Sequence, residues 1–173
     1  MIESRVGNMR AGLLDLIAYI NGERATKSMS LVEVGTYKGD SARLFAAAFS
    51  QVLCIDAWEP ELFNVPGDVQ EAEKLFDEWR ATVRNVNKVK ARSLLAAERL
   101  DNKSFDVIYI DASHDYISVR ADLEAWKSKP RLFLCGHDYW PSRFPGVVKA
   151  VNEVLVGKPD KVFKDTSFLW RVK

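Results

Sequence analysis

Five short strand-like runs alternate with segments of helical periodicity, and this alternation limits the folds open to the chain. Four runs are apolar, at residues 31–34, 52–55, 105–110 and 131–135, and the run at 88–92 is basic and alternating, as in a short strand at the edge of a sheet. Consecutive parallel strands need long crossover connections, and these are usually helices that pack on the sheet. The pattern therefore predicts an α/β fold: a Rossmann-like, doubly wound, mostly parallel sheet with helices on both faces.

The segments outside these runs show the apolar spacing of amphipathic helices. We expect helices at residues 9–20, 41–49, 68–85, 94–100, 117–126 and 146–156. Two further apolar stretches, 161–163 and 167–172, predict closing strands, so the sheet would have seven strands with an antiparallel one at its end. Residues 1–173 would form a single domain, with a helical segment at 1–30 and the core at 31–173.

The composition argues against several classes of protein. The chain of 173 residues is 47% hydrophobic and has a net charge of +1, which favours neither a nucleic-acid partner nor an anionic membrane surface. The N-terminal residues lack the pattern of a signal peptide, and no apolar run has the length of a membrane span, so a cytoplasmic location is expected. Cys54 and Cys135 lie in apolar runs, which predicts buried, reduced thiols.

The first run ends in a glycine turn, within the sequence LVEVGTYKGD at residues 31–40. Gly35 and Gly39 leave φ unrestricted and let a ligand approach the main chain. The next helix, with Asp40 or Ser41 as its expected cap, adds free N–H groups and the positive end of its dipole. The turn lacks G-x-G-x-x-G spacing, which argues against a nicotinamide-dependent oxidoreductase; an ordinary strand-to-helix turn is the alternative.

Asp56 follows the second run, about 20 residues after the glycine turn. In a doubly wound fold, an acid at this place accepts hydrogen bonds from the hydroxyl pair of a ribose. The alternative is a solvated carboxylate at the end of a strand. Residues 57–69 come next and carry Trp58, Phe63 and two prolines, which suit either a flap over a ligand or partly exposed cover.

Both histidines of the chain and three acids fall directly after the fourth and fifth runs: Asp111, His114, Asp115, His137 and Asp138. The carboxyl ends of parallel strands meet at one edge of a sheet, so these side chains should lie close together. An imidazole beside carboxylates suits general-base chemistry. Helix capping or a hydrogen bond to a buried carboxylate would account for His114 alone, but not for two histidines at one edge.

Longer stretches around these residues resemble a known family. The segment FDVIYIDASHDYISVRADLEAW at 105–126 joins a strand ending in D-x-x-H-x-Y to a helix ending in D-L-x-x-W, and GHDYW follows at 136–140. With Glu33, the glycine turn and Asp56, these motifs resemble class I S-adenosylmethionine-dependent methyltransferases, in particular small O-methyltransferase-like domains of the family-24 type. The resemblance extends from about residue 31 to the C-terminus.

The resemblance implies S-adenosylmethionine as the cofactor and methyl transfer to a hydroxyl of a small molecule or sugar. The positions that match the family's cofactor site are Glu33, Gly35, Thr36, Tyr37, Gly39, Asp56, Ala57, Ser93 and Asp111. Ser93 would lie near the adenine, although helix capping explains it equally well. His114 matches a general base, and Asp111 and Asp138 complete the implied catalytic group.

Asp111 and Asp138 also match positions that bind a divalent cation in metal-using relatives, and their oxygen ligands suit Mg²⁺. Those relatives commonly add a third oxygen ligand beside the fifth-strand acid, where this chain has His137 and Tyr139. Imidazole suits softer divalent ions better than Mg²⁺. Because of this departure, we do not expect a metal to be required.

The acceptor and the oligomeric state stay open at this level. The loop aromatics Trp58, Phe63, Tyr116, Trp140 and Phe144 suit a flat or sugar-like acceptor, and they suit a homodimer contact as well. A protein that binds S-adenosylmethionine without catalysis is the main alternative, because only about 30 residues precede the first strand and no large lid is evident. Neither nucleic acid nor membrane is expected as a partner.

Overall fold

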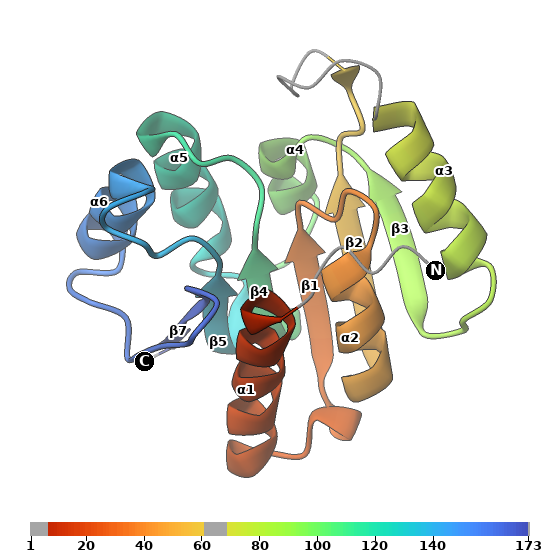
Figure 1. Cartoon of the computed structure of the whole chain (residues 1–173), viewed down its shortest axis with the longest axis horizontal. Helices are drawn as coiled ribbons and strands as arrows, with labels where there is room; N and C mark the ends of the chain where they lie inside the picture. The colour runs from red at the N-terminus through yellow and green to blue at the C-terminus, as the bar shows by residue number, and fades with distance from the viewer. Residues whose placement is uncertain (1–6, 61–68, 173) are drawn as a thin grey trace.

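A computed structural model describes residues 7–60 and 69–172 of the chain. In these residues one sheet has seven strands in the order β3-β2-β1-β4-β5-β7-β6 (Figure 1). They are β1 (Ser30–Val34), β2 (Gln51–Asp56), β3 (Val86–Lys90), β4 (Phe105–Ile110), β5 (Pro130–Gly136), β6 (Lys161–Val162) and β7 (Phe168–Arg171). The first five strands pair in parallel, and β7 runs antiparallel to both β5 and β6. The predicted fold class is confirmed.

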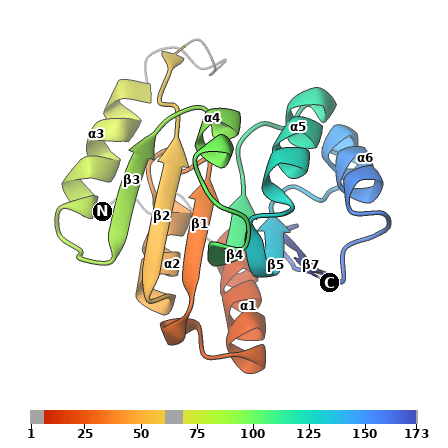
Figure 2. The same ribbon diagram turned by 180° about the vertical axis from the view of Figure 1, so that it is seen from behind.

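Helices cover both faces of this sheet. They are α1 (Asn8–Glu23), α2 (Asp40–Ala48), α3 (Val69–Arg80), α4 (Ser93–Glu98), α5 (Tyr116–Trp126) and α6 (Pro145–Val154), with a short 3-10 turn, η1 (Thr26–Ser28). Figure 1 shows α1, α2 and α3 on the near face of the sheet, and Figure 2 shows α4, α5 and α6 on the opposite face. The chain is therefore wound on both sides of the sheet, as the alternation of strands and helices predicts.

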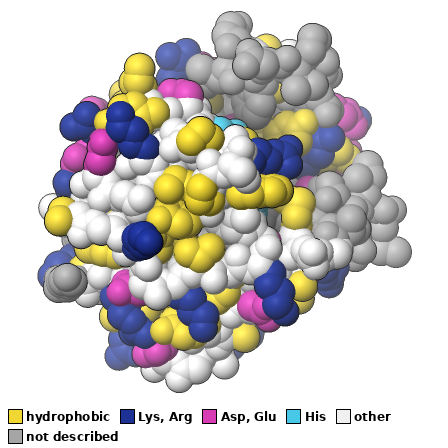
Figure 3. Space-filling view, turned by 60° about the vertical axis from the view of Figure 1, so that its left-hand side comes forward, with side chains coloured by type: hydrophobic (Ala, Val, Ile, Leu, Met, Phe, Trp, Pro, Cys, Tyr) yellow, Lys and Arg dark blue, Asp and Glu magenta, His cyan; other side chains and the backbone are white. Residues whose placement is uncertain are grey.

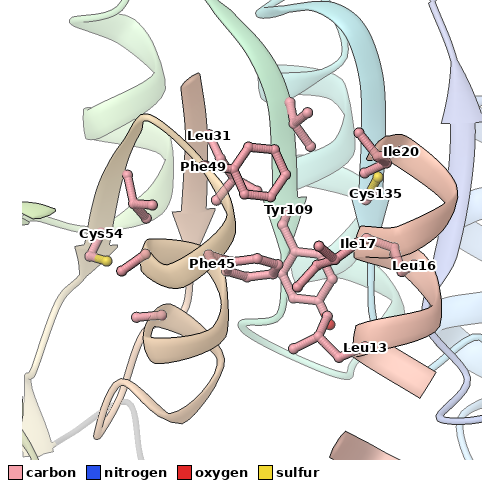
Figure 4. Close-up of a cluster of buried hydrophobic side chains, with 14 of the residues drawn as sticks. Leu13, Leu16, Ile17, Ile20, Leu31, Phe45, Phe49, Cys54, Tyr109 and Cys135 are labelled. Carbon is pink, nitrogen blue, oxygen red and sulfur yellow. The ribbon is translucent and has the colours of Figure 1, made fainter. Parts of the chain in front are cut away.

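Each face of the sheet has its own apolar core. On one face, Leu13 of α1 and Phe45 of α2 pack against Tyr109 of β4 (Figure 4). On the other face, Ile108 of β4 and Trp126 of α5 belong to a second buried cluster. The central strands are thus buried on both sides, which explains why they read as nearly continuous apolar runs.

The strand order reverses between β1 and β4. From β1 the chain winds outward through β2 to β3, and from β4 it winds the opposite way to β5. The loops after β1 and β4 therefore diverge at the carboxyl edge of the sheet. In doubly wound folds, ligands bind in the crevice at this reversal point.

The third helix is shorter than predicted. α3 ends at Arg80, although its apolar spacing suggested a helix to residue 85. Residues 81–85 instead turn the chain into β3, and the side-chain amide of Asn85 donates to the carbonyl oxygens of Ala46 (2.9 Å) and Phe49 (3.1 Å). These bonds fix the turn against the end of α2, so the last predicted turn of helix does not form.

The second helix begins differently from the prediction. Gly39, with φ of +82°, is its N-cap, and no side chain caps the helix. A Cβ atom on Gly39 would lie 2.7 Å from the Phe76 ring, so the position needs glycine for both its conformation and its space. Ser41, one of the two expected caps, uses its hydroxyl elsewhere: it donates to the Glu33 carboxylate.

Cys54 on β2 and Cys135 on β5 are buried and form no disulfide, as predicted. Burial raises the pKa of both thiols far above the ordinary value, so these thiols are unreactive. Among the residues described, no helix combines the length and apolar character needed to cross a membrane.

Candidate functional site

The loops after β1 and β4 touch at the reversal point of the sheet. Gly35, which follows β1, has φ of +90°, and a Cβ atom there would lie 2.1 Å from the carbonyl oxygen of Asp111, the first residue after β4. The Asp111 amide donates to the Val34 carbonyl (2.8 Å), and the Gly35 amide donates to the Ile55 carbonyl (2.9 Å). The expected cofactor turn and the expected catalytic group are therefore in direct contact.

Glu33, on β1, stabilises the conformation of the glycine turn. Its carboxylate is fully buried and accepts hydrogen bonds from the hydroxyls of Thr36 (3.1 Å) and Ser41. These two residues lie on either side of the turn that leads into α2. Glu33 thus acts on the loop that faces the crevice, and its own oxygens are enclosed by protein.

Asp56 connects the glycine turn to the loop after β2. Its Oδ2 accepts from the amide of Tyr37 (2.8 Å), and its Oδ1 accepts from the amide of Trp58 (2.9 Å). Burial raises the pKa of Asp56 above its usual range, although bonds from these amides and those of Ala57 and Thr36 oppose the shift. The carboxylate therefore orients the two backbone segments that border the crevice.

Trp58 is part of the core rather than cover for a ligand. It is 2% exposed, its ring stacks on Phe76 at 5.5 Å, and its indole N–H donates to the Tyr37 carbonyl (3.0 Å). The expectation of an exposed or half-buried Trp58 is wrong, because the indole fills the space between α3 and the glycine turn. Phe63 and the rest of the expected flap, at 61–68, lie outside the described residues.

Ser93 opens α4, but it does not cap that helix. The N-cap is Arg92, without a side-chain cap bond. The Ser93 hydroxyl accepts from the indole N–H of Trp126 (2.8 Å) and bonds Asp122, so it joins α4 to α5. Burial raises the pKa of Asp122 to about 6, and the bond from Ser93 opposes this rise. The capping explanation of Ser93 is therefore wrong, and its relation to an adenine stays a prediction.

His114, Asp138 and His137 form a chain of hydrogen bonds after β4 and β5. His114 Nε2 lies 2.6 Å from Asp138 Oδ2, and His137 Nδ1 lies 3.0 Å from Asp138 Oδ1. Asp111 Oδ1 is 3.9 Å from His137 Nδ1. The His114 side chain is 49% exposed, whereas that of His137 is 7% exposed. The predicted cluster is thus assembled, with His114 as the histidine that faces solvent.

The hydrogen bonds in this chain shift the pKa values of its members. Burial by itself would raise the pKa of Asp138, but the bonds from His114 and His137 outweigh burial and hold it well below the usual range. The bond to Asp138 raises the pKa of His114, and partial burial opposes that rise. Asp138 is therefore a fixed negative charge that makes His114 a stronger base.

Asp115 follows His114 in the sequence but has a structural role. It is the N-cap of α5: Oδ1 accepts from the Ser118 amide (3.0 Å), and Oδ2 accepts from the Ser113 hydroxyl (2.7 Å). These bonds lower the pKa of Asp115 to about 2. Asp115 shapes the loop, and the helix cap at this place belongs to it rather than to His114.

Asp111, His114 and Asp138 could share a cation. Each offers one ligand atom, and these atoms all lie within 4.8 Å of one another. Two carboxylates and one imidazole suit Mn²⁺, Fe²⁺ or Zn²⁺ better than Mg²⁺. The sequence reasoning considered His137 as the third ligand, but its Nδ1 bonds Asp138, and its ring is buried.

Sequence reasoning missed a buried acid behind the cluster. Asp165, in the turn between β6 and β7, has a fully buried side chain with Oδ2 at 3.8 Å from His137 Nε2. It accepts from the hydroxyl of Ser167 (2.8 Å), which also bonds the Tyr109 hydroxyl (3.2 Å). No motif identifies Asp165, because only the antiparallel return of β7 brings it beneath β5.

A shallow hollow opens over this cluster. Its walls are formed by the loops after β4 and β5 together with apolar side chains of α5, α6 and β7, including Val119, Leu123, Val147 and Phe168. Figure 3 shows histidine surface among hydrophobic side chains, with basic side chains close to it.

Comparison with known proteins agrees with this geometry. A family model described as a methyltransferase domain matches residues 32–139, a range that includes the glycine turn, Asp56, His114 and Asp138. The chain belongs to this family of methyltransferase domains. No curated protein matches the sequence of this chain.

Solved structures share the fold of this methyltransferase domain at low sequence identity. A Corynebacterium glutamicum protein is 16% identical with a TM-score of 0.65, over 92% of this chain and 79% of that chain. The N-methyltransferase NodS from Bradyrhizobium japonicum is 13% identical with a TM-score of 0.60, over 94% and 93%. CalS11, a TDP-rhamnose 3'-O-methyltransferase of calicheamicin biosynthesis, is 17% identical with a TM-score of 0.59, over 87% and 73%.

The chain spans between 51% and 79% of the first three solved structures that it matches. Similarity at these identities shows the fold, which is that of class I S-adenosylmethionine-dependent methyltransferases. The roles of individual residues have to come from the site itself.

Proposed function

We propose that this methyltransferase domain transfers a methyl group from S-adenosylmethionine to a hydroxyl of a small molecule or sugar. The observation that carries the proposal is the contact between Gly35 and Asp111, with His114 and Asp138 beside them. It puts a ligand-accommodating glycine turn next to a solvent-facing imidazole that a carboxylate polarises. A methyl donor and a base are needed side by side for transfer to oxygen.

The cofactor would lie along the edge of the sheet from β4 to β2. The methionine end would contact the turn from Gly35 to Gly39, and the ribose would lie at Asp56. The carboxylate of Asp56 already accepts from several backbone amides, so a ribose hydroxyl would share its oxygens with the amides of Tyr37 and Trp58. The adenine would extend toward Ala57 and Ser93.

The residues of the chain supply orientation and proton transfer. S-adenosylmethionine, when bound, supplies a methyl group already activated by its sulfonium. His114 Nε2 bonds Asp138, so Nδ1 is the nitrogen left to take the proton from the acceptor hydroxyl. In that transfer the acceptor oxygen would bond the methyl carbon while the carbon–sulfur bond breaks, and the electron pair of that bond would go to sulfur. Asp138 fixes the imidazole and stabilises the imidazolium that forms.

A divalent cation is a second element of the proposal. Asp111, His114 and Asp138 would hold it, and bound there it would lower the pKa of an acceptor hydroxyl. A cation bound by both His114 and Asp138 would replace the hydrogen bond between them, so base and metal site are competing uses of one cluster. Mn²⁺ is the better test ion, because imidazole is a poor ligand for Mg²⁺.

Isothermal titration with S-adenosylhomocysteine tests the first proposal, with EDTA, Mg²⁺ or Mn²⁺ in parallel samples. We expect micromolar binding in EDTA. Failure of the folded protein to bind either S-adenosylhomocysteine or S-adenosylmethionine would overturn the function. Binding strengthened by Mn²⁺, and lost again in Asp111→Asn, would support the cation; equal binding in all samples would count against it.

Turnover separates the enzyme from a protein that only binds the cofactor. A panel of hydroxylated aromatic and sugar acceptors can be incubated with labelled S-adenosylmethionine. Label in the acceptor, at a rate that falls in His114→Ala, is the expected outcome. Cofactor binding with no transfer to any acceptor would favour the non-catalytic alternative.

A further inference from the structure

We propose that Arg143, together with Trp140 and Phe144, binds an oxyanion group of the methyl acceptor, a carboxylate or a phosphate. The inference rests on the proposed O-methyl transfer and specifies its substrate class. The acceptor would carry a hydroxyl and an oxyanion at different ends of one ring. Arg143 lies outside the range matched by the family model, so the family does not assign it a part.

The loop from β5 to α6 brings the three side chains to the edge of the cluster. It leaves Asp138 and makes a turn in which the amides of Arg143 (3.1 Å) and Phe144 (2.8 Å) donate to the Trp140 carbonyl. The start of the turn is anchored by Tyr139, whose amide donates to the Thr166 carbonyl (3.0 Å). The turn is thus tied to the same end of β5 that supplies Asp138.

The guanidinium of Arg143 lies over two aromatic rings. Its Cζ is 5.6 Å from the centre of the Trp140 ring and 5.3 Å from the centre of the Phe144 ring. A guanidinium held over aromatic faces keeps its N–H groups in its own plane, where they can bind a carboxylate or phosphate with two bonds. The two rings therefore orient the group without occupying its donors.

Phe144 links this group to the proposed base. The His114 ring stacks on Phe144 at 4.8 Å with an angle of 22° between the planes. Phe144 thus contacts both Arg143 and His114. An acceptor that lies along this ring would reach both: its hydroxyl at His114, its oxyanion at Arg143.

The charges near Arg143 are consistent with an external partner. Among the residues described, no carboxylate forms an ion pair with Arg143, and its side chain is exposed. The neighbouring acids have other contacts: Asp138 bonds the two histidines, and Asp115 caps α5. By contrast, Arg131 at the opposite edge of the sheet bonds Asp106 at 2.9 Å. The charge of Arg143 is therefore available to a ligand.

Arg143 would also offset the repulsion that an anionic acceptor meets in this cluster. Asp111 and Asp138 carry negative charge next to the reacting hydroxyl. A positive group at the rim lowers the cost of bringing an oxyanion there and selects its orientation. A neutral acceptor would gain nothing from this residue, so the two kinds of acceptor can be told apart.

The test measures binding of matched small probes to the protein saturated with S-adenosylhomocysteine. The probes are para-hydroxybenzoate, para-hydroxyphenyl phosphate and the neutral para-hydroxybenzamide. Affinity is followed by NMR titration, with the side-chain N–H signal of Arg143 and the indole signal of Trp140 as reporters. We expect one or both anionic probes to bind at least about tenfold more tightly than the amide, and to shift both signals. The stronger anion identifies the carboxylate or the phosphate as the group that is bound.

Arg143→Gln should remove this preference while the affinity for S-adenosylhomocysteine stays unchanged. Arg143→Lys should retain part of it, because the charge persists and the planar fork is lost. Arg84→Gln, a change at an exposed arginine in the turn before β3, is the matched control and should bind all probes like the original protein.

Three outcomes would each overturn the inference. The original protein could bind the anionic probes no more tightly than the amide, or it could bind neither anion at millimolar concentration. Alternatively, Arg143→Gln could bind the anions as tightly as the original protein does. Loss of S-adenosylhomocysteine binding would instead overturn the proposed function. An anion site dependent on Arg143 would survive that result, so the two failures are distinguishable.

Discussion

Two pairs of loops lie at the carboxyl edge of the sheet, one pair after β1 and β2 and the other after β4 and β5. Their polar side chains differ in exposure and in the groups that they bond. In the first pair, called here the cofactor loops (residues 33–41 and 56–58), the Glu33 and Asp56 carboxylates are buried and hold neighbouring hydroxyls and amides. In the second pair, the acceptor loops (residues 111–116 and 137–144), the His114 side chain is 49% exposed and Trp140 is 41% exposed.

This difference indicates a division of work between the two pairs of loops. The cofactor loops stabilise their own backbone, so they are preorganised for a ligand that binds largely through main-chain groups. The acceptor loops leave an imidazole, a guanidinium and aromatic surface toward solvent, where chemistry and selectivity would take place. Changes in the first pair should therefore act on folding and cofactor affinity, and changes in the second on turnover.

The largest expected effect is at the contact between the two pairs. Gly35→Ala would add a Cβ atom 2.1 Å from the Asp111 carbonyl at a φ of +90°. We expect the free energy of unfolding to fall by about 4 kcal/mol, with loss of S-adenosylhomocysteine binding. Gly157→Ala is the matched control: its φ is +134°, with nothing within 4 Å of the added atom, so it suffers backbone strain alone. Equal losses in urea unfolding would refute the close contact.

The second largest effect is expected for a substitution in the acceptor loops that should leave cofactor affinity unchanged. His114→Ala removes the proposed base, and we expect turnover to fall by about 100-fold while the dissociation constant for S-adenosylhomocysteine stays the same. Steady-state kinetics and titration on one sample measure the two effects. Added imidazole should restore part of the rate. Turnover equal to that of the original protein would remove His114 from the mechanism.

Asp122 belongs to neither pair of loops: it is on α5 and bonds Ser93 on α4. Burial raises its pKa to about 6, whereas an unfolded aspartate ionises near pH 4, at about 3.9. Between these values the folded state keeps a proton that the unfolded chain has lost, so the free energy of unfolding falls as pH rises through this window.

Asp122→Asn should abolish that fall. The variant should be about 2 kcal/mol more stable than the original protein at about pH 8, and no more stable at about pH 4. Denaturant unfolding at the two pH values makes the comparison. An equal gain in the free energy of unfolding at both pH values would mean that the ionisation of Asp122 does not cause the difference in stability.

The smallest effect tests the cofactor loops directly. Asp56→Asn keeps the shape of the side chain but removes the charge that accepts from Tyr37 and Trp58. We expect about tenfold weaker binding of S-adenosylhomocysteine, with nearly normal turnover once S-adenosylmethionine is saturating. Asp101→Asn, at an exposed acid before β4, is the control. Unchanged affinity in Asp56→Asn would count against a ribose at this place.

Several site residues could be located from sequence because parallel strands all end at one edge. Asp56 and Asp111 follow an apolar run directly, and Asp138 comes three residues after the end of one, so their place at one edge of the sheet follows from the topology. The hydrogen-bond partners of each side chain could not be predicted in this way. Ser93 looked like a helix cap and instead bonds Trp126 and Asp122, and Trp58 looked like loop cover and is buried. Both errors have one cause: local spacing says nothing about the partner that another element brings.

The sequence by itself determined the winding of the sheet, the place of the glycine turn and the group of acids and histidines at the carboxyl edge. Apolar periodicity and the alternation of strands with helices depend on near neighbours in the chain, so they can be recognised locally. Only the tertiary structure decided which histidine faces solvent, that Asp165 lies close to His137, and that Phe144 contacts both Arg143 and His114. These relations depend on contacts between segments far apart in the chain, and packing of the whole domain sets them.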